Sequence, residues 1–133
     1  MPAPPSQLSS QDFLFRFLHW TRVKPDGTVN SGAFGLRGDP EISLGVEKLI
    51  PETALDHFCS VKPGHGLAKV TMDQIQAVGL NVQLEREPEW GEFAEAHAIL
   101  VGYAGWTNKR KDEAARALRD AANGWGVVRP PAR

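Results

Sequence analysis

The chain has almost no cysteine, no long hydrophobic run and almost no net charge. Its single cysteine, Cys59, excludes an internal disulfide framework and is typical of a protein from the reducing cytoplasm. No apolar run approaches the roughly 20 residues that span a bilayer, and Met1–Ser6 lacks the regions of a signal peptide. The formal net charge of −1 gives no overall attraction for nucleic acid or an anionic membrane. We therefore expect a cytoplasmic protein without a membrane partner.

The motifs of common cofactor enzymes are missing as well. The sequence contains no P-loop, no dinucleotide-binding fingerprint, no His-Glu-x-x-His and no nucleophile elbow. His57, Cys59 and His65 lie within one short window, but their spacing matches no structural zinc signature, and no clear fourth ligand follows. We therefore expect neither a cofactor nor a bound metal.

The length and composition of the chain predict one domain. It has 133 residues, of which 41% are hydrophobic and 23% are charged, as in an ordinary globular domain. The proline-rich start indicates a disordered lead over residues 1–8. We expect the domain to occupy residues 9–128, with a flexible tail over residues 129–133.

Three helices can be placed from their end signals. Pro51 stands at the first position of a helix that runs to about Cys59, where its missing N–H costs nothing. Thr71–Gln74 has the pattern of a capping box, and the helix that it starts ends at Gly79. Asn108–Asn123, capped by Thr107, carries an alanine-rich stripe at helical spacing, which permits close approach to a sheet.

Short extended segments separate these helices. The first segment, Leu8–Val23, allows either a helical turn capped by Ser9 or Ser10, or a strand, and we favour extended structure from about Phe15. Lys24–Gly27 has the residues of a tight turn. The other segments expected to be extended are Thr28–Phe34, Ile42–Val46, Leu67–Val70, Asn81–Leu84 and Ala96–Val101. The order of elements predicts an α+β fold: a small, mainly antiparallel sheet with about three helices, largely on one face.

The residue that most resembles a catalytic group is His97, at the start of the last apolar segment. Histidine is the side chain type most often used as a general acid or base, and a neighbouring glutamate, Glu92 or Glu95, could orient one ring nitrogen. Ser31, among small residues, and Asp26 supply a hydroxyl and an acid, which together with His97 would complete a hydrolytic triad. The structural alternative is a core histidine bonded to a backbone carbonyl, with a hairpin turn and an edge strand at Asp26–Phe34.

Six other residues are candidates for binding because they are basic or aromatic and lie near turns or element ends. They are Arg22, Phe34, Arg37, Trp90, Trp106 and Lys109. Trp90 stands in an acidic stretch, Glu85–Glu95, and therefore suggests an exposed aromatic side chain that meets a basic partner. Trp106 precedes Lys109, where basic residues oppose the helix dipole and would favour a phosphate. The alternative for each basic segment, including Arg37–Glu41, is a solvated surface.

Taken in order, several short motifs resemble a widespread family of small bacterial proteins without a settled activity. The likeness extends from about Arg16 to Asn123. The matching motifs are Asp26-Gly27-x-Val29-x-Ser31-x-Ala33-Phe34, Ser43-x-x-Val46, Gly79-Leu80-x-Val82 and His97-Ala98-x-x-Val101. The chain departs from the family where Ser43 and Val46 are not contiguous, and in its long acidic approach to His97. The resemblance implies a shared fold and a shared patch, and it draws attention to His97, Ser31 and Asp26.

Two functions follow from these observations. We favour a small bacterial binding or accessory protein, of a toxin–antitoxin or defence locus, that acts through contact with a protein partner of basic character. The alternative is a small metal-independent enzyme that acts on a phosphate-containing or nucleic-acid substrate. His97 would then be the acid or base, and Arg22 or Arg37 with Lys109 would stabilise charge.

Overall fold

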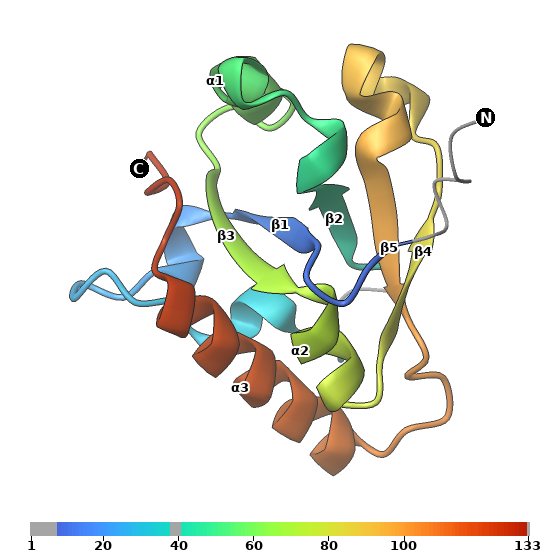
Figure 1. Ribbon diagram of the computed structural model, residues 1–133. Helices are drawn as coiled ribbons and strands as arrows, with labels where there is room; N and C mark the ends of the chain where they lie inside the picture. The colour runs from blue at the N-terminus through green and yellow to red at the C-terminus, as the bar shows by residue number, and fades with distance from the viewer. Residues whose placement is uncertain (1–7, 38–40, 133) are drawn as a thin grey trace.

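A five-stranded antiparallel sheet forms the centre of the part of the chain that the computed structural model describes, residues 8–37 and 41–132 (Figure 1). The strands are β1 (Phe13–Leu18), β2 (Ser43–Val46), β3 (Gly66–Thr71), β4 (Asn81–Leu84) and β5 (His97–Val101). They lie in the order β3-β1-β2-β5-β4. The longest register joins β1 to β3, from Phe13 opposite Thr71 to Leu18 opposite Gly66.

The two edges of the sheet differ. At one edge β4 pairs only with β5, and its alternate residues Asn81 and Gln83 are exposed. At the other edge the C-terminal segment runs beside β3: Leu67 exchanges backbone hydrogen bonds with Val128 and Arg129, and Ala132 donates to Gly64. Several of these hydrogen bonds involve the segment expected to be a flexible tail, residues 129–133, of which Arg133 lies outside the described residues.

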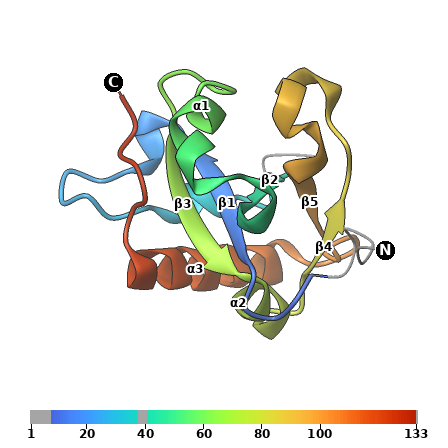
Figure 2. The ribbon, with the colours of Figure 1, turned by 45° about the horizontal axis from the view of Figure 1, so that its top comes forward.

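Two α-helices cover one face of the sheet (Figure 2). They are α2 (Met72–Ala77) and α3 (Asn108–Trp125). The capping box at Thr71 and Gln74 is present, and Thr107 caps α3, as the sequence predicted. The stripe of α3 is buried at Ala114, Ala115, Leu118 and Ala122, because small side chains let the helix approach the strands closely.

The opposite face is covered by the five-residue helix α1 (Leu55–Cys59) and a 3-10 segment, η5 (Pro88–Ala96). An aromatic core fills the space between them and the sheet. Phe58 and Trp90 meet edge to face with ring centroids 5.5 Å apart. A Cβ atom at Gly45 would lie 2.7 Å from Phe58 Cζ, so a glycine in β2 is what lets this ring reach the sheet.

The α+β class with an antiparallel sheet is confirmed, but the expectation of extended structure up to Val23 and over Thr28–Phe34 was wrong in part. β1 ends at Leu18 and is followed by a 3-10 turn, η1 (Trp20–Arg22), and Ser31–Phe34 forms another, η2. Side chains start both turns: His19 accepts a hydrogen bond from the Thr21 amide, and Asn30 accepts one from the Gly32 amide. Such local bonds compete with strand pairing. Within the described residues, no helix is both long and apolar enough to cross a membrane.

Candidate functional site

His97 is a buried residue of the core, with 2% of its surface exposed. Its Nδ1 lies 2.6 Å from the carbonyl oxygen of Glu85, and its Nε2 lies 3.1 Å from Ser43 Oγ. Because a carbonyl only accepts, Nδ1 donates to Glu85, and Nε2 shares the second hydrogen bond with the hydroxyl group of Ser43. The edge of Trp90 closes the remaining side, with ring centroids 4.7 Å apart. Both ring nitrogens therefore have a hydrogen-bond partner within the protein. This arrangement agrees with the structural alternative, a core histidine bonded to a backbone carbonyl.

The structure does not bring Ser31 or Asp26 to His97. Ser31 begins η2, which packs against α3 on one face of the sheet, whereas His97 packs with Trp90 on the other. Asp26 lies in the exposed turn before Thr28, whose hydroxyl and amide both donate to its carboxylate. These hydrogen bonds hold the pKa of Asp26 below its ordinary value. The three residues therefore form no catalytic triad in this structure.

Most of the binding candidates are already engaged within the protein. Phe34 and Trp90 are buried, so the expectation of an exposed Trp90 was wrong: η5 folds its indole into the aromatic core. Arg37 pairs with Asp112 at 3.2 Å, and the rest of its loop, Gly38–Pro40, lies outside the described residues. Trp106 lies under the guanidinium of Arg110, 3.9 Å from the ring centroid.

That stacking gives one of the basic residues at the start of α3 an internal partner. Lys109, beside it, is exposed at the first turn of the helix. Cations at this end oppose the helix dipole, and the cation–π contact of Arg110 offsets part of that cost. The cluster is therefore explained without a bound phosphate.

The window with His57, Cys59 and His65 does not form a metal cluster. Among the residues that the structure describes, no group of three or more His, Cys, Asp or Glu side chains could hold a metal ion. His57 pairs instead with Glu92 on η5, with 2.6 Å between Nε2 and Oε1. Burial raises the pKa of the Cys59 thiol, which therefore stays protonated at neutral pH.

Basic side chains converge at another place, around a cavity of about 160 Å³. We call it the basic pocket. It lies where the end of β1 and η1 meet η2 and the loop that leads into β3. Its basic lining residues are Arg16, His19, Arg22, Lys62 and His65, with Phe17, Gly32 and Ala33 completing it.

Backbone pairing and one glycine position these groups. Leu18 lies opposite Gly66 in the β1–β3 register, so the neighbouring His19 and His65 face each other with ring centroids 5.5 Å apart. Arg16 reaches toward η2 and donates to the carbonyl oxygens of Ala33 and Ser43, at 2.8 and 3.1 Å. The guanidinium of Arg22 lies over Gly32, where a Cβ atom would collide with Nη1.

The pocket concentrates positive charge. Among the described residues, no carboxylate lines the pocket. No carboxylate of the described residues lies within ion-pair distance of Arg22 or Lys62 either. The pKa of His65 is lowered, chiefly by burial and further by the charges of Lys62, His19 and Arg16, against a raising hydrogen bond to the Pro63 carbonyl. Bringing cationic groups together is costly, and a bound anion would relieve that cost.

Of the basic residues of the pocket, the sequence indicated Arg22 as a binding candidate, and it drew attention to His65 only as a possible metal ligand. His19 and His65 are far apart in the chain, and nothing in the sequence reports that β1 pairs with β3 in the register that joins them. The available signal was weaker: histidines and cations follow β1 and precede β3, at the ends of two neighbouring apolar segments.

Comparison with known proteins adds no relative: no protein-family model matches the chain, and neither a curated protein nor a solved structure is significantly similar to it. The likeness of its motifs to a bacterial family therefore stays a prediction, and the function has to be argued from the geometry of the described residues.

Proposed function

We propose that the protein binds a phosphate-containing ligand and that the basic pocket receives the phosphate group. The observation that carries this proposal is the convergence of two arginines, a lysine and two histidines on one small cavity with no carboxylate in its described lining. Ordinary surfaces intersperse both signs of charge, because like charges repel each other. A gathering of one sign in a hollow favours a ligand of the other sign.

The donors suit a phosphate in kind as well as in charge. The planar guanidinium of Arg22 can offer two parallel N–H groups to two phosphate oxygens, and Lys62 acts as a mobile point charge. His19 accepts from the Thr21 amide through Nδ1, so its Nε2 carries the proton in the neutral ring and is a further donor. Arg16 is already bonded to two carbonyls and adds fixed charge.

Calorimetry with inorganic phosphate tests the proposal. We expect saturable binding that weakens about tenfold in Arg22→Ala, the loss of a charge-assisted hydrogen bond of roughly 1.5 kcal/mol. Arg86→Ala is the matched control, since Arg86 is exposed and pairs with Glu95 away from the pocket. Equal affinities for the two variants, or no saturable binding by the wild type, would contradict the proposal.

A protein partner is the second candidate, and we propose the opposite edge of the sheet as its binding site. The features that favour it are the edge strand β4 and the exposed carboxylates of η5, which follows β4 in the chain, among them Glu89 and Glu92. An edge strand can pair with a strand of a basic partner, and a toxin or defence protein of the bacterial cytoplasm would fit. The test is whether a basic protein co-purifies with the wild type in stoichiometric amount. Its loss from the Glu89→Lys, Glu92→Lys double variant supports this candidate, and equal amounts with the wild type and the double variant reject it.

A further inference from the structure

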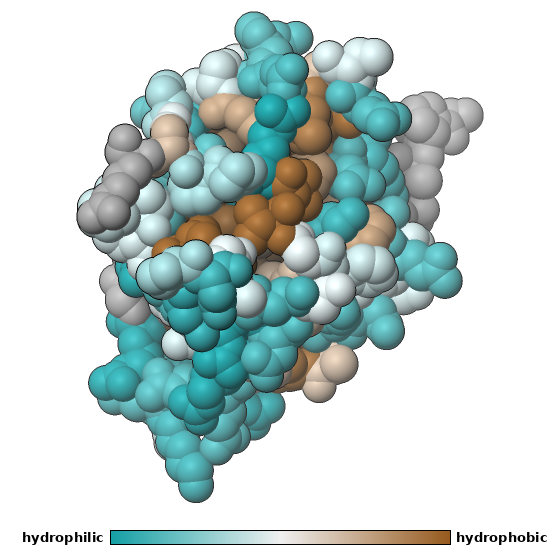
Figure 3. All heavy atoms as spheres, turned by 90° about the vertical axis from the view of Figure 1, so that its left-hand side faces the viewer, coloured by the Kyte–Doolittle hydropathy of each residue, from teal (hydrophilic) through white to brown (hydrophobic). Residues whose placement is uncertain are grey.

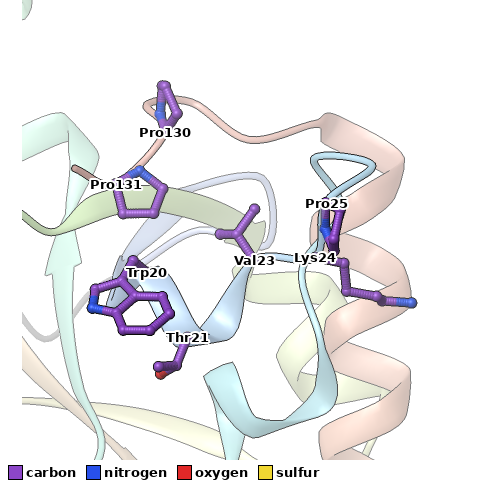
Figure 4. A pocket seen from close by; sticks show the side chains of 7 residues that line it. All are labelled: Trp20, Thr21, Val23, Lys24, Pro25, Pro130 and Pro131. Atoms are coloured by element: carbon purple, nitrogen blue, oxygen red, sulfur yellow. The ribbon is translucent and has the colours of Figure 1, made fainter. Parts of the chain in front are cut away.

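A second hollow, of about 590 Å³, lies next to the basic pocket, and we call it the tryptophan groove. Its lining residues are Trp20, Thr21, Val23, Lys24, Pro25, Pro130 and Pro131 (Figure 4). Figure 3 looks onto the side of the molecule that carries the C-terminal segment and the turn after η1, and hydrophobic side chains gather near its middle between hydrophilic ones. Trp20 is 40% exposed and is one of the few large hydrophobic residues at the surface of the described part of the chain.

The walls of this groove are held in place by the fold. The segment with Pro130 and Pro131 is held by hydrogen bonds on both sides of the two prolines: Arg129 bonds Leu67 at the start of β3, and Ala132 donates to Gly64 in the loop before it. Across the groove, Lys24 and Thr28 close the turn that carries Pro25. The groove is therefore preformed and would lose little conformational freedom when it is filled.

One short turn links the groove to the basic pocket. In η1 and the residue before it, His19 and Arg22 line the pocket, whereas Trp20 and Thr21 line the groove. The rings of His19 and Trp20 have centroids only 5.5 Å apart. A ligand that crosses η1 would therefore meet cations on one side and a flat apolar surface directly beside them.

We propose that the two hollows together bind single-stranded nucleic acid, with a base against Trp20 and the neighbouring phosphate in the basic pocket. This inference rests on the proposed function of the pocket and names the class of its ligand. A base has a flat face that stacks on an aromatic ring whatever its sequence, and in a nucleotide chain each base lies beside a phosphate. In a duplex the bases are already stacked and paired, so their faces cannot reach the indole.

Charge also favours a short contact. The chain as a whole is slightly acidic, so a long duplex gains nothing from its average field. The positive charge is local, and Lys24 at the end of the groove extends it by one more cation. Binding through a few phosphates predicts an affinity that falls only moderately with salt, in proportion to the number of contacts.

Fluorescence anisotropy with 5′-labelled oligonucleotides tests the inference, with ten-residue oligo-U and oligo-dT as probes and a duplex of the same length as comparison. We expect both single strands to bind at least tenfold more tightly than the duplex. Trp20→Ala should weaken single-strand binding about tenfold, and Trp20→Phe should retain most of it, because a ring remains. The phosphate affinity measured by calorimetry should stay the same in both variants.

Trp125→Ala is the matched control, because Trp125 is 49% exposed at the end of α3 and lines neither hollow. Thermal unfolding of each variant verifies that it is folded. If phosphate binds but the oligonucleotides bind no more tightly than phosphate, this inference is wrong and the proposed function stands. If neither binds, both are wrong. Equal losses in the Trp20→Ala and Trp125→Ala variants would also overturn the role of the groove.

Discussion

His19 and His65 face each other across the ends of β1 and β3, with ring centroids 5.5 Å apart. Phe17 and His65 meet edge to face, and Lys62, on the loop before β3, extends over the same phenyl ring. The pair thus sits on the edge of the aromatic core and opens toward the cations of the pocket. This placement couples the charge of the site to the stability of the fold.

The lowered pKa of His65 predicts how stability depends on pH. The folded protein disfavours the protonated ring, because of burial and the charges of Lys62, His19 and Arg16. The unfolded chain therefore binds the proton more readily, and the free energy of unfolding falls as pH decreases through the usual histidine pKa near 6.5. Denaturant unfolding between pH 7.5 and 5.0 should show this fall, and His65→Gln should make it smaller. An unchanged pH dependence in that variant would contradict the assignment.

His97→Ala tests the structural role of the buried histidine. The substitution leaves a cavity and removes the hydrogen bonds to Glu85 and Ser43, so we expect a loss of about 2–4 kcal/mol in the free energy of unfolding. Phosphate affinity at a temperature where the variant is folded should change less than twofold. A stable variant that no longer binds phosphate would show that His97 belongs to the site.

Gly32→Ala should separate binding from stability. The new Cβ would meet the end of the flexible Arg22 side chain, which can swing away at little cost to the fold. We expect phosphate affinity to fall about fivefold or more, since the guanidinium leaves the pocket. The unfolding free energy should change by less than about 1 kcal/mol. Gly124→Ala, in open space on α3, is the control and should leave phosphate binding intact.

Gly45→Ala probes the packing of the other face. Its Cβ would lie 2.7 Å from Phe58 Cζ, inside the aromatic core, where Phe58 is fully buried. Overpacking of this kind costs about 1–3 kcal/mol, to be measured by chemical unfolding. An unchanged stability would mean that α1 can shift away from the sheet, and the described contact between Gly45 and Phe58 would then not limit the packing.

The sequence predicted those elements whose signals are local. The capping box at Thr71, the cap at Thr107 and the alanine stripe of α3 depend on neighbours within one or two turns, and all are present in the structure. Ser31–Phe34 was misjudged because local hydrogen bonds turn the chain out of an extended conformation: the Gly32 amide donates to the side chain of Asn30, and the Ala33 amide donates to the Asn30 carbonyl. Alternation of residue types does not report such a bond.

The candidate site was less predictable because it depends on long-range pairing. His19 and His65 meet only through the register of β1 with β3, and Arg22 reaches the pocket only because residue 32 has no side chain. Trp90 misled for the opposite reason. Its neighbours along the chain are acidic, but the 3-10 segment η5 turns the indole inward against Phe58.

The most direct test of the basic pocket is a phosphate titration followed through the ring signals of the four histidines by NMR. His19 and His65 line the pocket, His57 pairs with Glu92 at the surface, and His97 is buried, so the chain provides its own controls. We predict that the signals of His19 and His65 shift together and saturate, and that the pKa of His65 rises when phosphate is bound. Shifts of equal size at His57, or none at His19 and His65, would contradict the proposal that this pocket binds phosphate.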